Sequence, residues 1–312
     1  MTSVSVLYVN ISGVSSEILK NLILAGIRGA IADGRPYPDA LSETPTSFLP
    51  PGERTADVSK KDDEEKPDKK RMKKMSVAKA MQPHVLELNP LLDECEVNEE
   101  DIDSIPAEYF AKFDIVIASH IGLDQATRIS KATASNNGKF YLVHSFGYYA
   151  CALIDLGESY TYRKEIGKDK LSDVMPISPY TSLENMAKKK LADVKDRWHK
   201  NGPPMVYAKY RAVLNYYEKK QVWPSEENAA DFVSVSKEFL KDQGLDAGYL
   251  GDDDDLHRLA VTATAEVSPV CAVMGGVLGN EVIKAISGKG EPANNMLLFD
   301  GTDGGCKSFA LK

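Results

Sequence analysis

The sequence predicts an α/β protein whose Rossmann-like sheet carries an inserted helical block. Three observations support this fold class. The chain opens on an apolar strand pattern followed by a turn and an amphipathic helix. Further strand patterns then alternate with helical ones, which is typical of parallel sheets with crossover helices. A long polar helical stretch separates this part from an apolar C-terminal segment. A length of 312 residues allows one large domain or two ordinary ones.

The first unit is a predicted β-α-β motif. Val4 to Val9 is an apolar, β-rich run, as expected for a buried parallel strand. Glu17 to Ala25 has apolar residues at helical spacing, and Gly26 is a suitable helix stop. Ala30 to Asp33 is expected to form the second strand. The crossover between two parallel strands should be right-handed.

The pattern then changes to a polar, strongly charged stretch. Residues 36–75 have too little apolar surface to order themselves, so we expect a mobile insertion. Periodicity returns after it. The expected elements are a helix over Val77 to Leu88, a strand over Phe113 to Ser119, a helix over Ala126 to Ser135, a strand over Lys139 to Gly147, and a continuation of the sheet over Cys151 to Glu165.

The last third begins with helices and returns to apolar character. Helices are expected at Leu183 to His199, Met205 to Glu218, Ala229 to Asp242, Leu256 to Ala265 and Ser268 to Gly288. The last of these should have Ser268 as its N-cap and Pro269 at its first position. A hairpin with an Asp303-Gly304 turn ends the chain. We therefore expect a Rossmann-like domain over 1–171 and 266–312, with 172–265 as an inserted helical subdomain.

Composition excludes several classes of protein. The net charge of −8 disfavours a basic nucleic-acid binder. The four cysteines form no C-x-x-C pair, so we expect neither a structural zinc site nor any other metal site. No run approaches the length of a transmembrane helix, so we expect no membrane partner. No signal peptide is visible at the start of the sequence.

The turn after the first strand lacks the residues that a nucleotide phosphate needs. Glycines there allow a tight turn, close approach to phosphate and close packing of helix on strand. In this chain the three roles fall to Asn10, Ser12 and Ser15, and only Gly13 lies between them. We expect a turn that still forms but cradles phosphate poorly.

Two aspartates lie where a ligand of an open α/β sheet would bind. Asp33 ends the second strand, where an acidic residue can hold a ribose hydroxyl, although capping a loop is the alternative that the degraded turn favours. Asp124 follows a strong strand and could ligate a metal, but a helix N-cap is the favoured interpretation. Together with Asn10, Ser12, Gly13 and Ser15, they define a degenerate nucleotide site that we expect to be non-functional.

No catalytic residues stand out. The acidic neighbours of Cys95 raise a thiol pKa, and a buried free cysteine is usually part of the core. The five histidines show no ligand spacing. A basic stretch resembles a nuclear localisation signal, with a solvated loop as the alternative; its residues are Lys69, Lys70, Arg71, Lys73 and Lys74.

Four stretches together resemble one known family. They are ILKNLILAGIRG from Ile18, the FDIVIAS strand, VHSFGYYACALIDLGE from Val143 and, most specifically, SPVCAVMGGVLGNEVIKAIS…PANNMLLFDG from Ser268. In consistent order they resemble the small, regulatory (Aos-type) subunit of the heterodimeric SUMO-activating enzyme. Its family of ubiquitin-like modifier activating enzymes has the ThiF/MoeB-type adenylation fold.

The resemblance implies a non-catalytic role. In this family a catalytic subunit binds ATP and magnesium, adenylates SUMO and forms the thioester, while the small subunit keeps a degenerate site and completes the enzyme. ATP and magnesium would therefore belong to the partner, no cofactor to this chain, and SUMO would be reached through the complex. Ser76 and Val77 fall where an active half carries an asparagine and an arginine that contact ATP. The expected localisation is the nucleus, with the cytoplasm as a second compartment.

The apolar helix near the C-terminus is the expected partner interface. A pair of adjacent glycines within a helix suggests close backbone approach. The predicted contact residues are Pro269, Val273, Met274, Gly275, Gly276 and Leu278. Family members also begin with a segment resembling Y-x-R-Q-x-R-L-W-G, with an arginine that reaches the partner's ATP. This sequence shows no match to that segment, which leaves open whether its start is complete.

Three alternatives remain open on the sequence alone. The first is the equivalent subunit for the Nedd-type modifier, which the chain length disfavours. The second is an NAD-dependent Rossmann oxidoreductase, which Asp33 would suit and the missing glycines would not. The third is a self-sufficient adenylating enzyme, and direct nucleotide binding by the isolated chain would distinguish it from a degenerate subunit.

Overall fold

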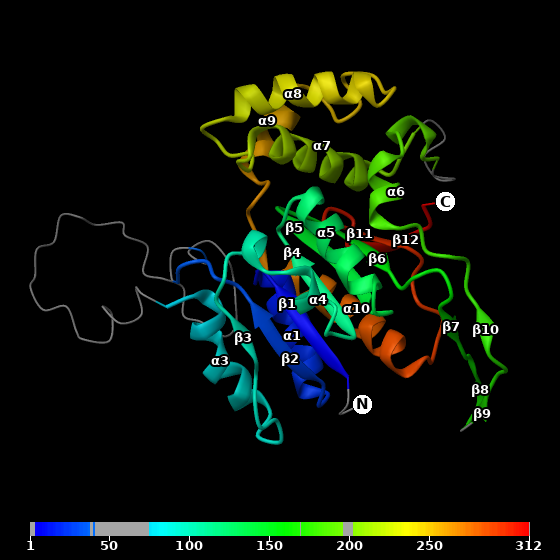
Figure 1. Ribbon diagram of the computed structural model, residues 1–312. Helices are drawn as coiled ribbons and strands as arrows, with labels where there is room; N and C mark the ends of the chain where they lie inside the picture. Colours follow the sequence, from blue (N-terminus) through cyan, green and yellow to red (C-terminus); the bar gives the residue numbers. More distant parts are fainter. Residues whose placement is uncertain (1–3, 38–39, 41–74, 169, 196–201, 312) are drawn as a thin grey trace, which may run out of the picture.

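The fold is built around one mixed sheet, seen in a computed structural model that describes residues 4–37, 40, 75–168, 170–195 and 202–311 (Figure 1). The sheet has eight strands in the order β12-β11-β6-β5-β4-β1-β2-β3. Five neighbouring strands are parallel: β1 (Ser5–Val9), β2 (Arg28–Ala32), β3 (Val97–Asn98), β4 (Ile115–Ser119) and β5 (Lys139–Phe146). The other three pair antiparallel: β6 (Tyr149–Asp155), β11 (Met296–Asp300) and β12 (Gly305–Phe309).

Helices cover both faces of this sheet, so the central strands are apolar on both sides. Along β1, Leu7 and Val9 belong to one hydrophobic cluster, while Val6 and Tyr8 belong to the other. The face of Val6 is covered by α1 (Gly13–Leu24), α3 (Val77–Leu88) and α10 (Ser268–Ser287). The face of Leu7 is covered by α4 (Ala107–Phe110), α5 (Leu123–Ala134), α6 (Leu183–Lys188) and α7 (Met205–Lys220).

The helical block consists of α7, α8 (Ala229–Asp242) and α9 (Asp253–Val261), and lies at one end of the sheet (Figure 1). Its apolar residues do not form a core of their own. Tyr207 of α7 and Phe232 of α8 belong to the same hydrophobic cluster as Leu7 and Val116 of the sheet. The expected helices are therefore present, and the domain boundaries around them stay a prediction.

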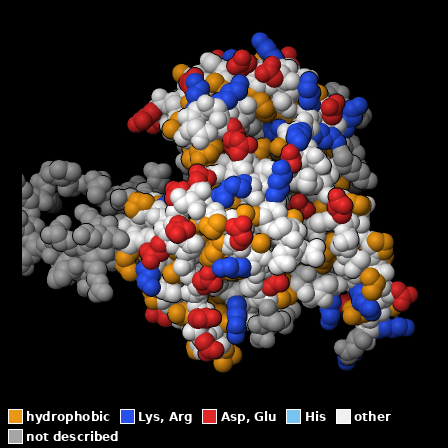
Figure 2. Space-filling view, in the orientation of Figure 1, with side chains coloured by type: hydrophobic (Ala, Val, Ile, Leu, Met, Phe, Trp, Pro, Cys, Tyr) orange, Lys and Arg blue, Asp and Glu red, His pale blue; other side chains and the backbone are white. Residues whose placement is uncertain are grey.

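The remaining elements are short. Two 3₁₀ turns, η2 (Ile102–Ser104) and η3 (Leu191–Asp193), flank longer elements. Two small sheets lie beside the main one, formed by β7 (Thr161–Tyr162) with β10 (Met175–Pro176) and by β8 (Glu165–Gly167) with β9 (Lys170–Leu171). On the face shown in Figure 2, acidic and basic side chains are interspersed, so no basic stripe of the kind that binds nucleic acid covers the described residues there.

The structure corrects several expected boundaries. The strand expected over Cys151 to Glu165 ends at Asp155, and the helix expected to reach His199 ends at Lys188. Val267, not Ser268, is the N-cap of α10. Most of the expected insertion lies outside the described residues, and so do the basic residues Lys69, Lys70, Arg71, Lys73 and Lys74.

One expectation about membrane spans was wrong in part. By length and composition, the 20 residues of α10 could cross a membrane, with a mean hydropathy of 1.4. The apolar residues on the buried side of α10 belong to the hydrophobic core. Val270, Met274, Leu278 and Val282 pack in the cluster that also holds α1. Their packing is that of a core helix.

Candidate functional site

The candidate site lies at the carboxyl ends of β1 and β4, where ligands of open α/β sheets bind. The chain leaves β1 into α1 on one face and leaves β4 into α5 on the other, so the two loops diverge here. Asn10 and His120, which follow these strands, both have positive φ angles, of 61° and 48°. Asn10 connects the loops after β1 and β4, because its side-chain amide donates to the carbonyls of Ser119 at 2.9 Å and His120 at 3.0 Å.

Ser12 and Ser15 cap the helix that starts at this edge. The backbone N–H of Ser15 donates to Oγ of Ser12 at 3.2 Å, and the N–H of Ser12 donates to Oγ of Ser15 at 2.8 Å. This capping box stabilises the first turn of α1. Both side chains are buried, so the serines that replace glycines have become structural parts of the turn.

A glutamate from the far end of the chain fills the N-terminus of α1. Glu266 accepts hydrogen bonds from the backbone N–H of Gly13 at 2.6 Å and of Val14 at 3.3 Å. Its side chain is only 2% exposed. The first N–H groups of a helix and its dipole attract an anion, and in nucleotide-binding proteins that anion is a phosphate. In this chain the carboxylate of Glu266 occupies that position.

Further polar groups hold Glu266 in its ionised form. Ser145 donates to its carboxylate at 2.5 Å, and Nε2 of His120 lies 3.4 Å from it. Burial raises the pKa of Glu266. The charge of His120 and the hydrogen bonds from His120, Ser145 and the N–H of Gly13 lower it by more, so the pKa lies below its usual value. Glu266 is therefore a carboxylate at neutral pH.

A second glutamate fills the N-terminus of α5. Glu218 of α7 accepts from the backbone N–H of Leu123 at 2.5 Å and of Asp124 at 3.3 Å. Burial raises the pKa of Glu218, and the nearby charge of Asp124 raises it further. Asp124 itself is exposed and lies inside the first turn, so its expected role as N-cap was wrong: Gly122 is the N-cap. The described residues contain no group of three or more His, Cys, Asp or Glu side chains that could hold a metal ion.

Asp33 has been drawn into an internal ion pair. Its buried carboxylate accepts from Nε of Arg35 at 2.9 Å, from Nη2 of Arg35 at 2.7 Å and from the N–H of Ile11 at 2.8 Å. Nη2 of Arg35 also donates to the carbonyl of Ile11. The carboxylate that would bind a ribose hydroxyl thus fixes the loop after β1, in line with the loop-capping alternative.

A cavity of about 560 Å³ remains beside these loops. Its walls include Asn10, Arg35, His120, Tyr217 and Trp223. The rings of Tyr217 and Trp223 stack on each other, with 4.1 Å between the ring centres. The cavity contains no free phosphate-binding turn, because the N–H groups at the starts of α1 and α5 already donate to Glu266 and Glu218.

The side chains present do not fit a nucleotide triphosphate. Besides the two occupied helix N-termini, Ser76 caps α3 and donates to Glu99 at 2.7 Å, and Val77 is fully buried. Neither Ser76 nor Val77 has a cationic side chain that could contact a phosphate.

The pKa values of all four cysteine thiols are raised. Burial raises the pKa of Cys95 to about 11, and the charge of Glu96 adds to the increase. Burial also raises the pKa values of Cys151, Cys271 and Cys306. A reactive cysteine needs the opposite, a lowered pKa that yields thiolate.

Sequence reasoning missed the residues that close the site. Glu266 is 253 positions from Gly13 and Glu218 is 95 positions from Leu123. No local pattern marks a carboxylate that caps a helix from such a distance. The sequence does contain a signal for Arg35, because an arginine two positions after a strand-end aspartate can form an ion pair with it.

The predicted interface residues divide into two sets. Met274, Gly275 and Leu278 are buried within this chain. Pro269, Val273 and Gly276 are exposed on the opposite side of α10. Whether a partner covers them stays a prediction, which now concerns the exposed set.

The curated relatives of this chain that are given below share one name. No protein-family model matches the chain. It is 28% identical over 325 residues to SUMO-activating enzyme subunit 1 of Homo sapiens, covering 96% of this chain and 86% of that protein. The identity is 27% over 329 residues for the Mus musculus subunit and 23% over 313 residues for that of Dictyostelium discoideum, which cover 96% of this chain and 85% and 84% of the relatives. Along nearly its whole length, the chain is therefore similar to SUMO-activating enzyme subunit 1 from several eukaryotes.

Proposed function

We propose that this chain is the non-catalytic, regulatory subunit of a SUMO-activating enzyme. It pairs with a catalytic subunit that uses ATP and magnesium to adenylate SUMO and then forms the thioester. The similarity to SUMO-activating enzyme subunit 1 supports this proposal. The parallel part of the sheet suits a Rossmann-like fold, and we propose that it is of the ThiF/MoeB adenylation type with the helical block as its inserted subdomain.

One structural observation carries the non-catalytic part of the proposal. Glu266 occupies the N-terminus of α1, where a nucleotide phosphate would have to bind. Two anions cannot share that position, because burying like charges together is strongly unfavourable. ATP binding to this chain would require Glu266 to leave the site.

The partner contacts the exposed side of α10. This side carries Pro269, Val273 and Gly276, with the side chain of Val273 44% exposed. A backbone can approach closely at Gly276, since a Cβ there would have no atom within 4 Å. Small and apolar residues on an exposed helix face suit close helix packing. We further propose a nuclear location, for which the basic stretch from Lys69 to Lys74 is the candidate signal.

Reconstitution tests the proposal directly. The purified chain is mixed with the catalytic subunit of a SUMO-activating enzyme, and SUMO thioester formation is measured with ATP. We expect no thioester and no ATP binding from the chain alone, and thioester formation from the pair. Tight ATP binding by the isolated chain, or a pair that neither associates nor reacts, would contradict the proposal.

A matched pair of variants tests the surface on α10. Val273→Asp places a charge in the proposed interface and should weaken association by at least about tenfold. Leu91→Asp is the control, because Leu91 is 88% exposed in the loop after α3. Size-exclusion chromatography of the mixed subunits measures both. Equal association of the two variants would place the interface elsewhere.

A further inference from the structure

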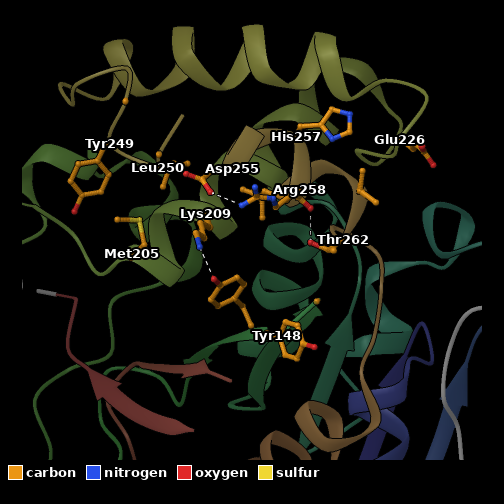
Figure 3. Close-up of a pocket in the computed structure, with 16 residues that line it drawn as sticks. Tyr148, Met205, Lys209, Glu226, Tyr249, Leu250, Asp255, His257, Arg258 and Thr262 are labelled. Carbon is orange, nitrogen blue, oxygen red and sulfur yellow. Dashed lines mark hydrogen bonds and ion pairs between the residues drawn. The ribbon is translucent and has the colours of Figure 1, made fainter. Parts of the chain in front are cut away.

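A second cavity lies between the helical block and the turn that joins β5 to β6 (Figure 3). Its volume is about 910 Å³, within the range of pockets that bind small ligands. The walls come from the start of α7, from α9 and the loop before it, and from the turn at Gly147 and Tyr148. It is separate from the edge of the sheet that Glu266 and Glu218 close, and none of the residues that line the cavity there lines this one.

Lys209 of α7 places a positive charge in this cavity. Its ammonium donates to the hydroxyl of Tyr149 at 2.8 Å and lies 4.0 Å from the centre of that ring. Lys209 is partly buried, and it forms no ion pair with a carboxylate of the described residues. An ammonium group has three N–H donors, so Tyr149 leaves donors available for an acceptor in the cavity.

The acidic side chains of the cavity do not neutralise Lys209. Asp255 pairs with Arg258 at 3.2 Å and also accepts from the backbone N–H of Asp252 at 3.2 Å. In Figure 3 Glu226 lies toward the right edge of the view and Lys209 nearer its centre, with no ion pair drawn between them. Arg258, the ion-pair partner of Asp255, also lines the cavity, so the charges of these two side chains offset each other.

Beside a few polar side chains such as His257 and Thr262, apolar and aromatic side chains line much of the cavity. Tyr148 is 63% exposed and Val261 is 41% exposed, and both line the cavity with Met205. An ammonium in such surroundings loses part of its hydration, and an anion that pairs with it offsets that cost. Apolar walls around a single cation complement a ligand with one negative charge and an apolar body.

We propose that this cavity binds a carboxylate attached to an apolar group. The carboxylate pairs with Lys209 and accepts from its free N–H donors, while the apolar group contacts Tyr148, Met205 and Val261. Two sources share this chemistry: a free organic acid and the terminal carboxylate of a peptide that ends in an apolar residue. The proposal does not depend on SUMO activation, and its test needs neither ATP nor a partner subunit.

A charge-matched pair of probes tests the proposal. The full chain is titrated with 3-phenylpropionate and, separately, with neutral 3-phenylpropionamide, and binding is followed by calorimetry. We expect the acid to bind at least about tenfold more tightly than the amide, which corresponds to roughly 1.4 kcal/mol. Equal binding of acid and amide, or no binding of the acid at 10-fold to 100-fold molar excess, would overturn the proposal.

Two lysine variants assign the effect to one side chain. Lys209→Met keeps the aliphatic stem and removes the charge, so it should abolish the preference for the acid. Lys219→Met is the control, since Lys219 lies on the same helix and pairs weakly with Glu238 at 3.8 Å. Unchanged melting temperatures show that both variants are folded. A Lys209→Met variant that keeps the preference would overturn the assignment.

Peptide probes distinguish the two sources. A tetrapeptide that ends in phenylalanine is compared with its C-terminal amide and with 3-phenylpropionate. Tighter binding of the free peptide than of the small acid indicates a peptide terminus, and the reverse order indicates a free organic acid. Both orders require the carboxylate, so equal affinity of the peptide and its amide would again contradict the proposal.

Discussion

At the residue scale, the polar groups at the carboxyl edge of the sheet pair with one another. Asp33, a residue type that could serve a ligand, is paired with Arg35, and the helix N-terminus that could hold a phosphate is paired with Glu266. The serines that replace glycines cap the same helix. Asp33, Glu266 and the two serines have each found an internal partner, because an unpaired buried polar group would cost about 1–3 kcal/mol.

Substitution of Glu266 should expose this arrangement. Glu266→Ala leaves the donors of Gly13, Val14 and Ser145 without their acceptor, so we expect a loss of roughly 3–5 kcal/mol of unfolding free energy. The converging donors should then bind a small anion. Formate should raise the melting temperature of this variant more than that of the unchanged chain.

Thermal unfolding with and without formate measures both effects. Glu87→Ala is the control, because Glu87 is 78% exposed on α3, and it should show neither the loss nor the rescue. If Glu266→Ala were as stable as the control, Glu266 would not be the internal anion of this site.

Acid should weaken the fold through His144. Burial lowers the pKa of His144 well below 6.5, and the charge of nearby His120 lowers it further. The unfolded chain therefore takes up a proton below about pH 6.5 that the folded chain does not, and stability present above that pH is lost as the pH falls. One such proton contributes a slope of up to about 1.4 kcal/mol per pH unit.

The slope can be assigned by substitution. His144→Gln should reduce the loss of unfolding free energy between pH 6.5 and 5.0, measured by urea titration, whereas His84→Gln, at a site whose side chain is 40% exposed, serves as the matched control. An identical pH slope in the His144 variant and the unchanged chain would contradict this assignment.

At the element scale, the apolar helix α10 has two different sides, one packed and one exposed. Its inner side packs against α1 so closely that a Cβ on Gly275 would overlap Cβ of Glu17. Its outer side has open space at Gly276. The sequence predicted the helix and the packing role of the glycine pair, but it could not show that Gly275 is packed against α1 while Gly276 is open to solvent.

The two glycines should respond to alanine in opposite directions. Gly275→Ala forces α10 away from α1 and should cost about 1–3 kcal/mol. Gly276→Ala meets no atom and should add up to about 1 kcal/mol through its helix propensity. Chemical denaturation of the isolated chain measures the unfolding free energy of both variants. Equal changes in the two variants would mean that α10 is not packed on α1 as described.

At the scale of the whole molecule, the helical block and the sheet share one hydrophobic cluster. Trp223 of the helical block packs on that cluster and contacts His144 of β5 at a ring distance of 5.7 Å. Elements that share a core unfold together, because neither keeps its buried surface without the other.

We therefore expect one cooperative unfolding transition. Tryptophan fluorescence of a Trp198→Phe variant, which leaves Trp223 as its one tryptophan, and far-ultraviolet circular dichroism should give the same urea midpoint. A fluorescence midpoint well below that of circular dichroism would instead mark residues 172–265 as a separately folding unit.

Most of the fold could be predicted because its signals are local. Periodicity placed the helices over Val77–Leu88 and Ala229–Asp242 at the bounds that the structure has. It failed after Asp155, where alternation continues but the chain leaves the main sheet for a small one, since strand pairing depends on distant neighbours.

The sequence by itself determined the α/β class, the degraded turn at Asn10, Ser12 and Ser15, and the resemblance to a SUMO-activating subunit. Only the tertiary structure decided which groups occupy the carboxyl edge of the sheet. Glu266 and Glu218 reach the two helix N-termini from segments far along the chain, and the cavity at Lys209 forms only where the helical block meets the sheet. The reason is that turns and periodicity depend on near neighbours, whereas the electrostatics of a buried site depend on which distant charges the fold brings together.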